Sequence, residues 1–78
     1  MPSVTIYTTP TCTYCHMAKD YFKEHAIAYE EKDVAIDIPA QEEMIEKSGQ
    51  MGVPVIDVDG KIVIGFDRTR LEALLGIQ

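Results

Sequence analysis

The stretch VTIYTTPTCTYCH, residues 4–16, joins a strand-like run to a helix-like run and places two cysteines at the junction. Val4 to Thr8 alternates β-branched, aromatic and apolar residues, which predicts a β-strand. A threonine-proline-threonine segment interrupts this run. From Thr13 to about His25, apolar residues recur three and four positions apart, as they do on one face of a helix. Cys12 is therefore expected at the start of a helix, with Cys15 one turn inside it.

The middle of the chain continues the alternation of strands and helices. Residues 27–34 alternate in polarity for most of their length and predict a second strand. Asp37 is placed to cap a second helix, which has Pro39 in its first turn and ends at Ser48-Gly49.

Two further strands and a helix complete the chain. Val53–Val58 and Lys61–Ile64 are both rich in β-branched residues, and Asp59-Gly60 between them is a strong signal for a two-residue hairpin. Gly65-Phe66-Asp67 then leads into a last helix. Its inward-facing residues are expected to be Leu71, Leu74 and Leu75.

The predicted order of elements is therefore βαβαββα. Alternating strands and helices of this kind pack as an α/β fold, here a four-stranded mixed sheet with helices on both faces. The 78 residues have room for one domain, 1–78, and a hydrophobic fraction of 46% is ordinary for a globular core.

Composition excludes several classes of function. Thirteen acidic residues against seven basic ones give a net charge of −6, which argues against binding to nucleic acid or to an anionic membrane surface. The apolar runs are too short to span a bilayer, and no signal-peptide pattern precedes the first strand. The only two cysteines lie three positions apart, whereas a disulfide scaffold spreads its cysteines along the chain. We expect a cytoplasmic protein and a monomer, and no large apolar patch on a helix face argues otherwise.

The position of the cysteine pair decides its chemistry. At a helix start, unpaired backbone N–H groups and the positive end of the helix dipole face the Cys12 sulfur. This setting stabilises the thiolate, which is the species that attacks disulfides. Cys15 lies on the same side of the helix and deeper. We expect Cys12 to attack a substrate disulfide and Cys15 to displace the reduced substrate, so that an external reductant must regenerate the dithiol.

Two neighbours of the pair have either a supporting or a purely structural role. Thr13 offers a hydroxyl to the Cys12 thiolate or simply begins the helix, and His16 assists when protonated or lies in solvent. The pair itself has a structural alternative, as two small buried hydrophobes or a static disulfide. A strand-to-helix junction near the amino terminus disfavours that alternative.

These residues resemble the glutaredoxins, in particular a group of very short glutaredoxin-like proteins. The resemblance covers essentially the whole chain and rests on Ile6–His16, Gly52–Val55 and Gly65–Arg68. A C-x-x-C pair alone is a weak signal. Its combination with a later Val-Pro that opens a strand, and with Gly-Phe-Asp before a terminal helix, is specific.

The resemblance implies a thioredoxin fold, a cis peptide bond before Pro54, and a Val53 backbone that pairs with an incoming peptide or glutathione. Proline is the residue for which a cis bond is cheap, and it has no N–H. The implied reaction is reduction of protein or glutathione mixed disulfides, with no bound cofactor and no metal. Electrons would come from glutathione or a thioredoxin-reductase-type flavoprotein, and disulfide-containing proteins would be the substrates. Beside the catalytic Cys12 and Cys15, the residues implied in binding substrate or glutathione are Thr13, Tyr14, Val53, Pro54, Gly65, Phe66 and Asp67.

Departures from the family pattern leave the electron donor open. Thr9 stands where glutathione-using members carry a lysine, and Gly52 replaces the threonine before Val-Pro. Residues 64–68 keep one glycine and one aspartate of Gly-Gly-x-Asp-Asp, and the aspartate, Asp67, can accept the ammonium of glutathione. Gly65-Phe66 is similar to the redoxins that reduce ribonucleotide reductase and draw electrons from a flavoprotein, although those continue with Arg-Pro. Phe66 itself is either a core anchor or a contact surface.

Other classes of function stay open beside this one. Zinc would need Cys12, Cys15, His16 and His25, but about 13 Å of helix rise separates the two histidines. An iron–sulfur cluster shared between two copies is compatible with Thr13, because members of the family sometimes hold one when proline does not follow the first cysteine. The C-x-x-C-H pattern also fits covalent haem. Finally, a redox fold can serve as a non-catalytic binding domain, although the presence of both sulfurs favours activity.

Overall fold

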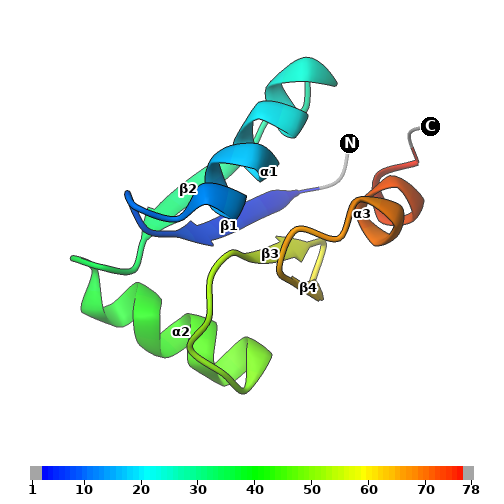
Figure 1. Cartoon of the computed structure of the whole chain (residues 1–78). Coiled ribbons are helices and arrows are strands. Elements are labelled where there is room, and N and C mark those ends of the chain that lie inside the picture. Colours follow the sequence, from blue (N-terminus) through cyan, green and yellow to red (C-terminus); the bar gives the residue numbers. More distant parts are fainter. Residues whose placement is uncertain (1–2, 77–78) are drawn as a thin grey trace.

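The computed structural model describes residues 3–76, and its elements follow the predicted order (Figure 1). The predicted domain spans residues 1–78, and residues 1–2 and 77–78 lie outside the described part. Strands and helices alternate up to a closing hairpin and a last helix. The elements are β1 Val4–Thr8, α1 Thr13–Glu24, β2 Glu30–Asp33, α2 Ile38–Ser48, β3 Val55–Val58, β4 Lys61–Ile64 and α3 Arg68–Leu75.

The four strands form one mixed sheet in the order β2-β1-β3-β4. Strand β1 pairs parallel with β2 and antiparallel with β3, and β3 pairs antiparallel with β4. Opposite Tyr7 lies Val55, which in turn lies opposite Ile64. The residues just before β3 and just after β4 therefore lie at the same end of the sheet as the last residue of β1, beside the cysteine pair.

Helices cover both faces of the sheet, as predicted (Figure 1). Because side chains alternate along a strand, Ile6 faces one side of the sheet and Tyr7 the other. Ile6 packs with Phe22 of α1 and Leu71 of α3, whereas Tyr7 packs with Met44 of α2. The sheet thus separates two hydrophobic cores.

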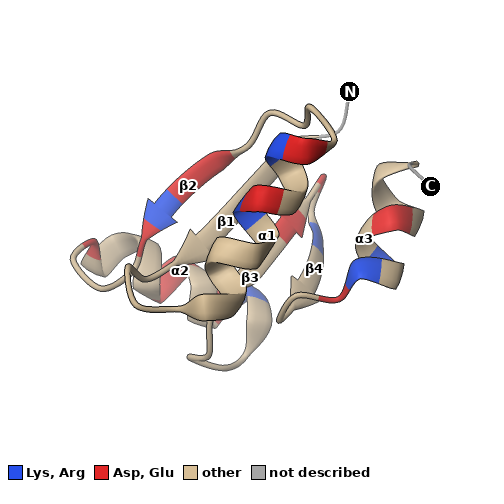
Figure 2. Ribbon diagram, turned by 45° about the horizontal axis from the view of Figure 1, so that its top comes forward, with Lys and Arg blue, Asp and Glu red and all other residues tan. Residues whose placement is uncertain are grey.

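Strand β2 is shorter than the predicted strand over residues 27–34, and that prediction was too long at both ends. Ile27 still donates its N–H to Phe22 O, 2.8 Å away, as part of the end of α1. Ladder pairing with β1 covers only Glu30 to Asp33, opposite Thr5 to Thr8. The pairing partner, not local alternation, limits the strand. The four residues are all charged, consistent with an exposed edge (Figure 2).

Strand β3 begins at Val55, so the predicted strand over Val53–Val58 was two residues too long at its start; Pro54 has no N–H for a ladder bond, and pairing with β1 begins at Val55. Short-range signals set most of the remaining boundaries as predicted. The Asp37 side chain accepts from the Ala40 N–H and caps α2, and Gly49 ends that helix in the left-handed region. Asp59 and Gly60 both have positive φ, 51° and 88°, as a type I′ hairpin turn requires. None of the helices that residues 3–76 form is long and apolar enough to cross a bilayer.

Candidate active site

Cys12 is the N-cap residue of α1, as predicted. Its backbone is extended, with φ −84° and ψ 111°, and its sulfur accepts the Cys15 N–H at 3.2 Å. The Cys12 carbonyl accepts the His16 N–H at 3.2 Å and so begins the helix. Its side chain is partly exposed. The sulfur therefore meets both solvent and the donor end of a helix, an arrangement that favours negative charge on it.

Cys15 differs sharply from its neighbour, since its relative exposure is 0%. Burial raises the pKa of the Cys15 thiol, and its hydrogen bond with Cys12 raises the pKa further. Hydrogen bonds from the Thr8 side chain and the Thr9 backbone act in the opposite direction. Both cysteines are free thiols in this structure. The pair therefore consists of a partly exposed sulfur and a buried sulfur beside it.

Thr8 is a site residue that sequence reasoning did not single out. It ends β1 on the face that α1 covers, with 1% relative exposure, and it is the buried polar residue of the described core. Its hydroxyl lies within hydrogen-bonding reach of Cys15 and of the Thr9 carbonyl, 3.3 Å away. A hydroxyl in the last strand position before a C-x-x-C pair is the signal that would have identified it.

The segment before β3 forms the opposite side of the site. The Val53–Pro54 peptide bond is cis, as the family resemblance implied, and Pro54 is buried. By strand register, residues 53 and 54 lie beside the end of β1. No hydrogen bond within residues 3–76 involves the Val53 backbone, which is therefore available to an extended ligand.

Gln50 clamps the turn that leads into this segment, and sequence reasoning missed it. Its side-chain carbonyl accepts the Gly52 N–H at 2.6 Å, and its amide donates to the Gly52 carbonyl at 3.1 Å. A Cβ at position 52 would lie 2.6 Å from the side-chain carbonyl oxygen of Gln50. The glycine that replaces the usual threonine therefore makes room for a local clamp.

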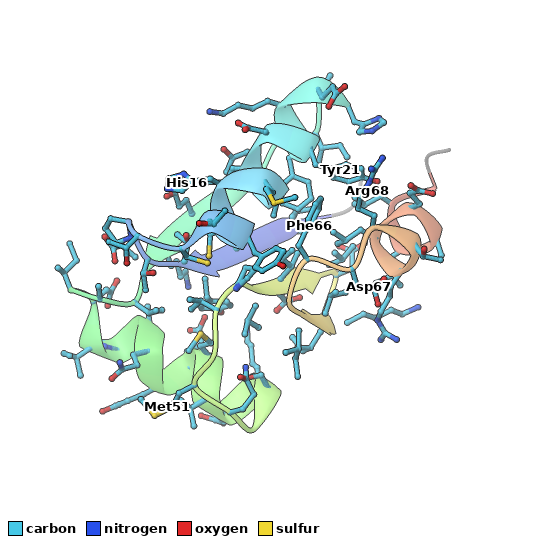
Figure 3. The ribbon with its side chains drawn as sticks, in the orientation of Figure 1. His16, Tyr21, Met51, Phe66, Asp67 and Arg68 are labelled. Carbon is cyan, nitrogen blue, oxygen red and sulfur yellow. The ribbon has the colours of Figure 1, made fainter. Side chains whose placement is uncertain are left out.

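The loop after β4 reaches the site only in part. Gly65 donates its N–H to the Pro54 carbonyl at 2.8 Å and so joins this loop to the cis-proline segment. Phe66 is half-buried against the core, with its ring 5.6 Å from that of Tyr21 (Figure 3). Asp67 is the N-cap of α3, since its carboxylate accepts the Arg70 N–H at 3.2 Å. One of its oxygens thus already has a structural role.

The remaining predicted neighbours of the pair are exposed. Thr13 begins α1, and Tyr14 is 62% exposed beside it. The His16 ring lies 2.9 Å from the Pro10 carbonyl and fixes the loop before Cys12 (Figure 3). That contact gives His16 a structural role in the cysteine loop. No group of three or more metal-ligating side chains occurs within residues 3–76.

Known proteins share both the sequence pattern and this architecture. The glutaredoxin family model matches residues 4–63. A glutaredoxin-like 8.6 kDa protein of the rubredoxin operon of Clostridium pasteurianum is 42% identical over 72 residues, 92% of this chain and 96% of that protein. The glutaredoxin-like protein NrdH of Lactococcus lactis is 38% identical over 74 residues, 91% and 97% of the two chains. A thioredoxin-like protein of known crystal structure superposes over 100% of both chains with a TM-score of 0.92 at 32% identity.

Proposed function

Because this chain belongs to the glutaredoxin family, we propose that it is a dithiol–disulfide oxidoreductase with Cys12 as nucleophile and Cys15 as resolving thiol. The inequality of the two thiols is the observation that carries this proposal. Cys12 is accessible and receives a helix N–H, whereas Cys15 is buried and its pKa is raised by burial. Disulfide exchange requires a thiolate that can reach the substrate and a second thiol that can reach only the first.

The reaction proceeds in two exchanges. The Cys12 thiolate attacks one sulfur of a substrate disulfide, forms a mixed disulfide and releases the other half as a thiolate, which takes a proton from solvent. Cys15 then loses its proton and attacks the Cys12 sulfur, which releases the second half of the substrate. The substrate gains two electrons and two protons, and the protein is left with a Cys12–Cys15 disulfide.

The backbone beside the cysteine pair aligns the substrate. The unpaired Val53 N–H and C=O lie next to the end of β1, so an extended peptide that bears a disulfide can pair there as an added strand. Pro54, the next residue, has no backbone N–H and so presents no unpaired donor at that edge. Exposed Tyr14 supplies apolar contact on the α1 side.

We propose a thioredoxin-reductase-type flavoprotein, rather than glutathione, as the electron donor. Thr9 provides no cation for a glutathione carboxylate, and one oxygen of Asp67, the residue that would hold the ammonium, is engaged in capping α3. A dithiol of a flavoprotein depends on neither group. It would attack the Cys12–Cys15 disulfide, return both cysteines to thiols and become a disulfide itself.

The experiment compares two reducing systems with one aromatic disulfide as substrate: NADPH with a thioredoxin-reductase-type flavoprotein, and NADPH with glutathione and glutathione reductase. We expect fast NADPH consumption with the flavoprotein and slow consumption with glutathione. Fast turnover with glutathione alone would overturn the assignment of the donor but not the dithiol chemistry.

Cysteine variants test the roles themselves. Cys12→Ser should lose all turnover, while Cys15→Ser should accumulate a mixed disulfide with the substrate, detectable by intact mass. Full activity of Cys12→Ser would refute the mechanism. Visible absorbance in freshly purified protein that disappears in both variants would identify a bound iron–sulfur cluster instead.

A further inference from the structure

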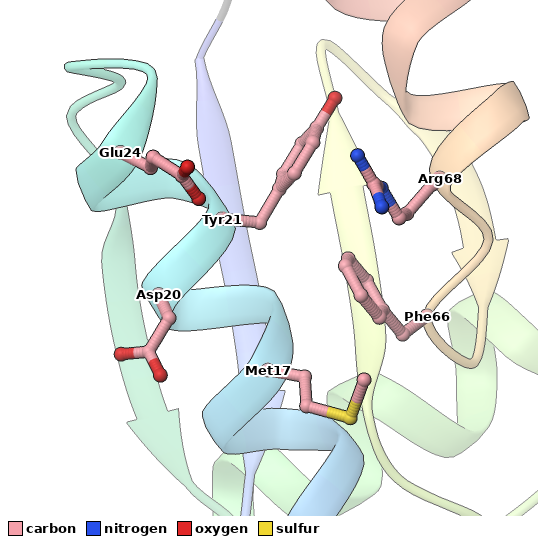
Figure 4. A pocket seen from close by; sticks show the side chains of 6 residues that line it. All are labelled: Met17, Asp20, Tyr21, Glu24, Phe66 and Arg68. Atoms are coloured by element: carbon pink, nitrogen blue, oxygen red, sulfur yellow. The ribbon is translucent and has the colours of Figure 1, made fainter.

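A groove of about 350 Å³ lies between α1 and the start of α3, and neither cysteine lines it. Figure 4 shows its two walls, one contributed by α1 and the other by the loop and first turn of α3. Its lining residues are Met17, Asp20, Tyr21, Glu24, Phe66 and Arg68. The mechanism proposed above uses none of their side-chain functional groups.

The floor of the groove is apolar. The rings of Tyr21 and Phe66 meet edge to face at 5.6 Å, and Met17 beside them is 46% exposed. Tyr21 is almost fully buried, yet its hydroxyl has no hydrogen-bond partner within residues 3–76. An apolar side chain from another molecule would remove the exposed part of this floor from water.

The charges on the α1 wall of the groove favour a basic partner. Asp20 and Glu24 lie one turn apart on α1, and neither forms an ion pair with any residue from 3 to 76. On the opposite wall, the Arg68 guanidinium lies over the Tyr21 ring at 5.6 Å rather than beside either carboxylate (Figure 4). Two carboxylates at this spacing repel each other, and a cation between them relieves the repulsion.

We propose that this groove binds a segment of a protein partner that carries a basic side chain next to an apolar one. The basic group would lie between Asp20 and Glu24, and the apolar group would cover Met17 and the aromatic floor. The net charge of −6 also favours approach of a basic surface. Figure 2 shows both acidic and basic positions on the α1 ribbon, and of these charged residues it is Asp20 and Glu24 that line the groove.

The position of the groove links this binding to the redox site. Met17 follows Cys12 by five residues on the same helix, which corresponds to about 7.5 Å of rise. A segment held in the groove would therefore lie beside a disulfide presented to Cys12. This step, and only this step, rests on the proposed redox function; binding to the groove does not require reactive cysteines.

The test is a ¹H–¹⁵N NMR titration of the reduced protein with a cysteine-free octapeptide, acetylated and amidated, that contains adjacent lysine and leucine. We expect shift changes centred on the amides of Met17, Asp20 and Phe66. Replacing the peptide's lysine by glutamate, or its leucine by serine, should abolish most of the change. Added salt should weaken binding, because the charged contact is exposed.

A pair of double variants separates local recognition from bulk charge. Asp20→Asn/Glu24→Gln removes the groove carboxylates and should weaken peptide binding about fivefold. Glu42→Gln/Glu46→Gln removes two exposed carboxylates at the same spacing on α2 and should leave binding unchanged. Equal weakening in both double variants, or shifts outside the groove, would overturn the proposal. Groove shifts that grow with protein concentration without peptide would identify a second copy as occupant and overturn it as well.

The same variants keep the two proposals distinguishable. Asp20→Asn/Glu24→Gln should reduce a small uncharged disulfide as fast as the unmodified protein, because that substrate does not reach the groove. Peptide binding that survives in Cys12→Ser while turnover is lost would support the groove and the nucleophile separately. Failure of Cys12→Ser to lose turnover would refute the redox mechanism alone.

Discussion

Replacing Glu43 by glutamine removes the central charge from a network on the α2 face of the sheet. The hydroxyl of fully buried Tyr7 donates to the Glu43 carboxylate, and Lys32 Nζ lies 3.0 Å from the same oxygen. Lys47 lies 3.6 Å from it and also bonds Asp57 at 2.8 Å. These contacts tie β1, β2, β3 and α2 together, so the substitution should lower the free energy of unfolding.

The pKa of Glu43 sets the magnitude of the effect. The hydrogen bonds from Tyr7 and Lys32 lower this pKa from 4.5 to about 2. Without solvent screening, that shift would correspond to about 3 kcal/mol of stabilisation. The Glu43 side chain is 41% exposed, so solvent screening reduces the contribution. We expect Glu43→Gln to lose about 1–2 kcal/mol near neutral pH.

The loss should depend on pH with a definite sign. The folded-state pKa lies below the ordinary one, so the ionised carboxylate is the stabilising form. Its contribution is fully present above pH 4.5 and is lost as the pH falls towards about 2. The difference between the unmodified protein and Glu43→Gln should therefore shrink over this interval.

Urea unfolding followed by far-ultraviolet circular dichroism, at several pH values from 7 to 2.5, measures this difference. Glu42→Gln, the adjacent exposed position on α2, is the matched control and should change stability by less than about 0.5 kcal/mol. A Glu43→Gln protein as stable as the control at pH 7, or a stability difference that does not vary with pH, would refute the reasoning.

Three further substitutions test other parts of the structure. Thr8→Val removes a hydrogen bond that opposes the rise in the Cys15 pKa. Attack of Cys15 on a chromophoric Cys12 mixed disulfide, followed by stopped flow, should therefore slow about threefold. An unchanged rate would exclude a role for the Thr8 hydroxyl. In Gly60→Ala the added Cβ meets no neighbouring atom, but the residue must adopt φ 88°. The free energy of unfolding, measured with denaturant, should therefore fall by about 1 kcal/mol. No loss of stability would mean that the turn had changed type. Leu71→Ala removes the one fully buried side chain of α3 and should cost about 2–5 kcal/mol, with faster amide exchange in that helix; protection equal to the original would show that other contacts hold α3.

Sequence reasoning located the cysteine pair correctly because local signals determine its position. The change from a two-residue to a helical period between Thr8 and Thr13 places Cys12 at a helix start. Asp37 and the Asp59-Gly60 turn likewise act through their own backbone and nearest neighbours. Such features require no knowledge of what packs against them.

Features that depend on tertiary partners were missed or misjudged. The length of β2 follows from how much of β1 is available to pair, which alternation in residues 27–34 does not reveal. Gln50 gains its role only because Gly52 leaves space for its amide. The capping role of Asp67 at α3 also emerges only in the fold, and its predicted part in binding a ligand stays a prediction.

Adjacent residues of β1 serve separate purposes because a strand alternates its side chains between two faces. Thr8 contacts the buried thiol on the α1 face, while Tyr7 joins the charge network on the α2 face. A change to the network can reach the cysteines only through the backbone of β1, which ladder hydrogen bonds hold on both sides. Glu43→Gln should therefore lower stability while the alkylation rate of Cys12 in the folded protein stays the same. A changed alkylation rate, measured at pH 7 without denaturant, would mean that β1 transmits strain between its two faces. The charge network on the α2 face would then be coupled to the cysteine site on the α1 face.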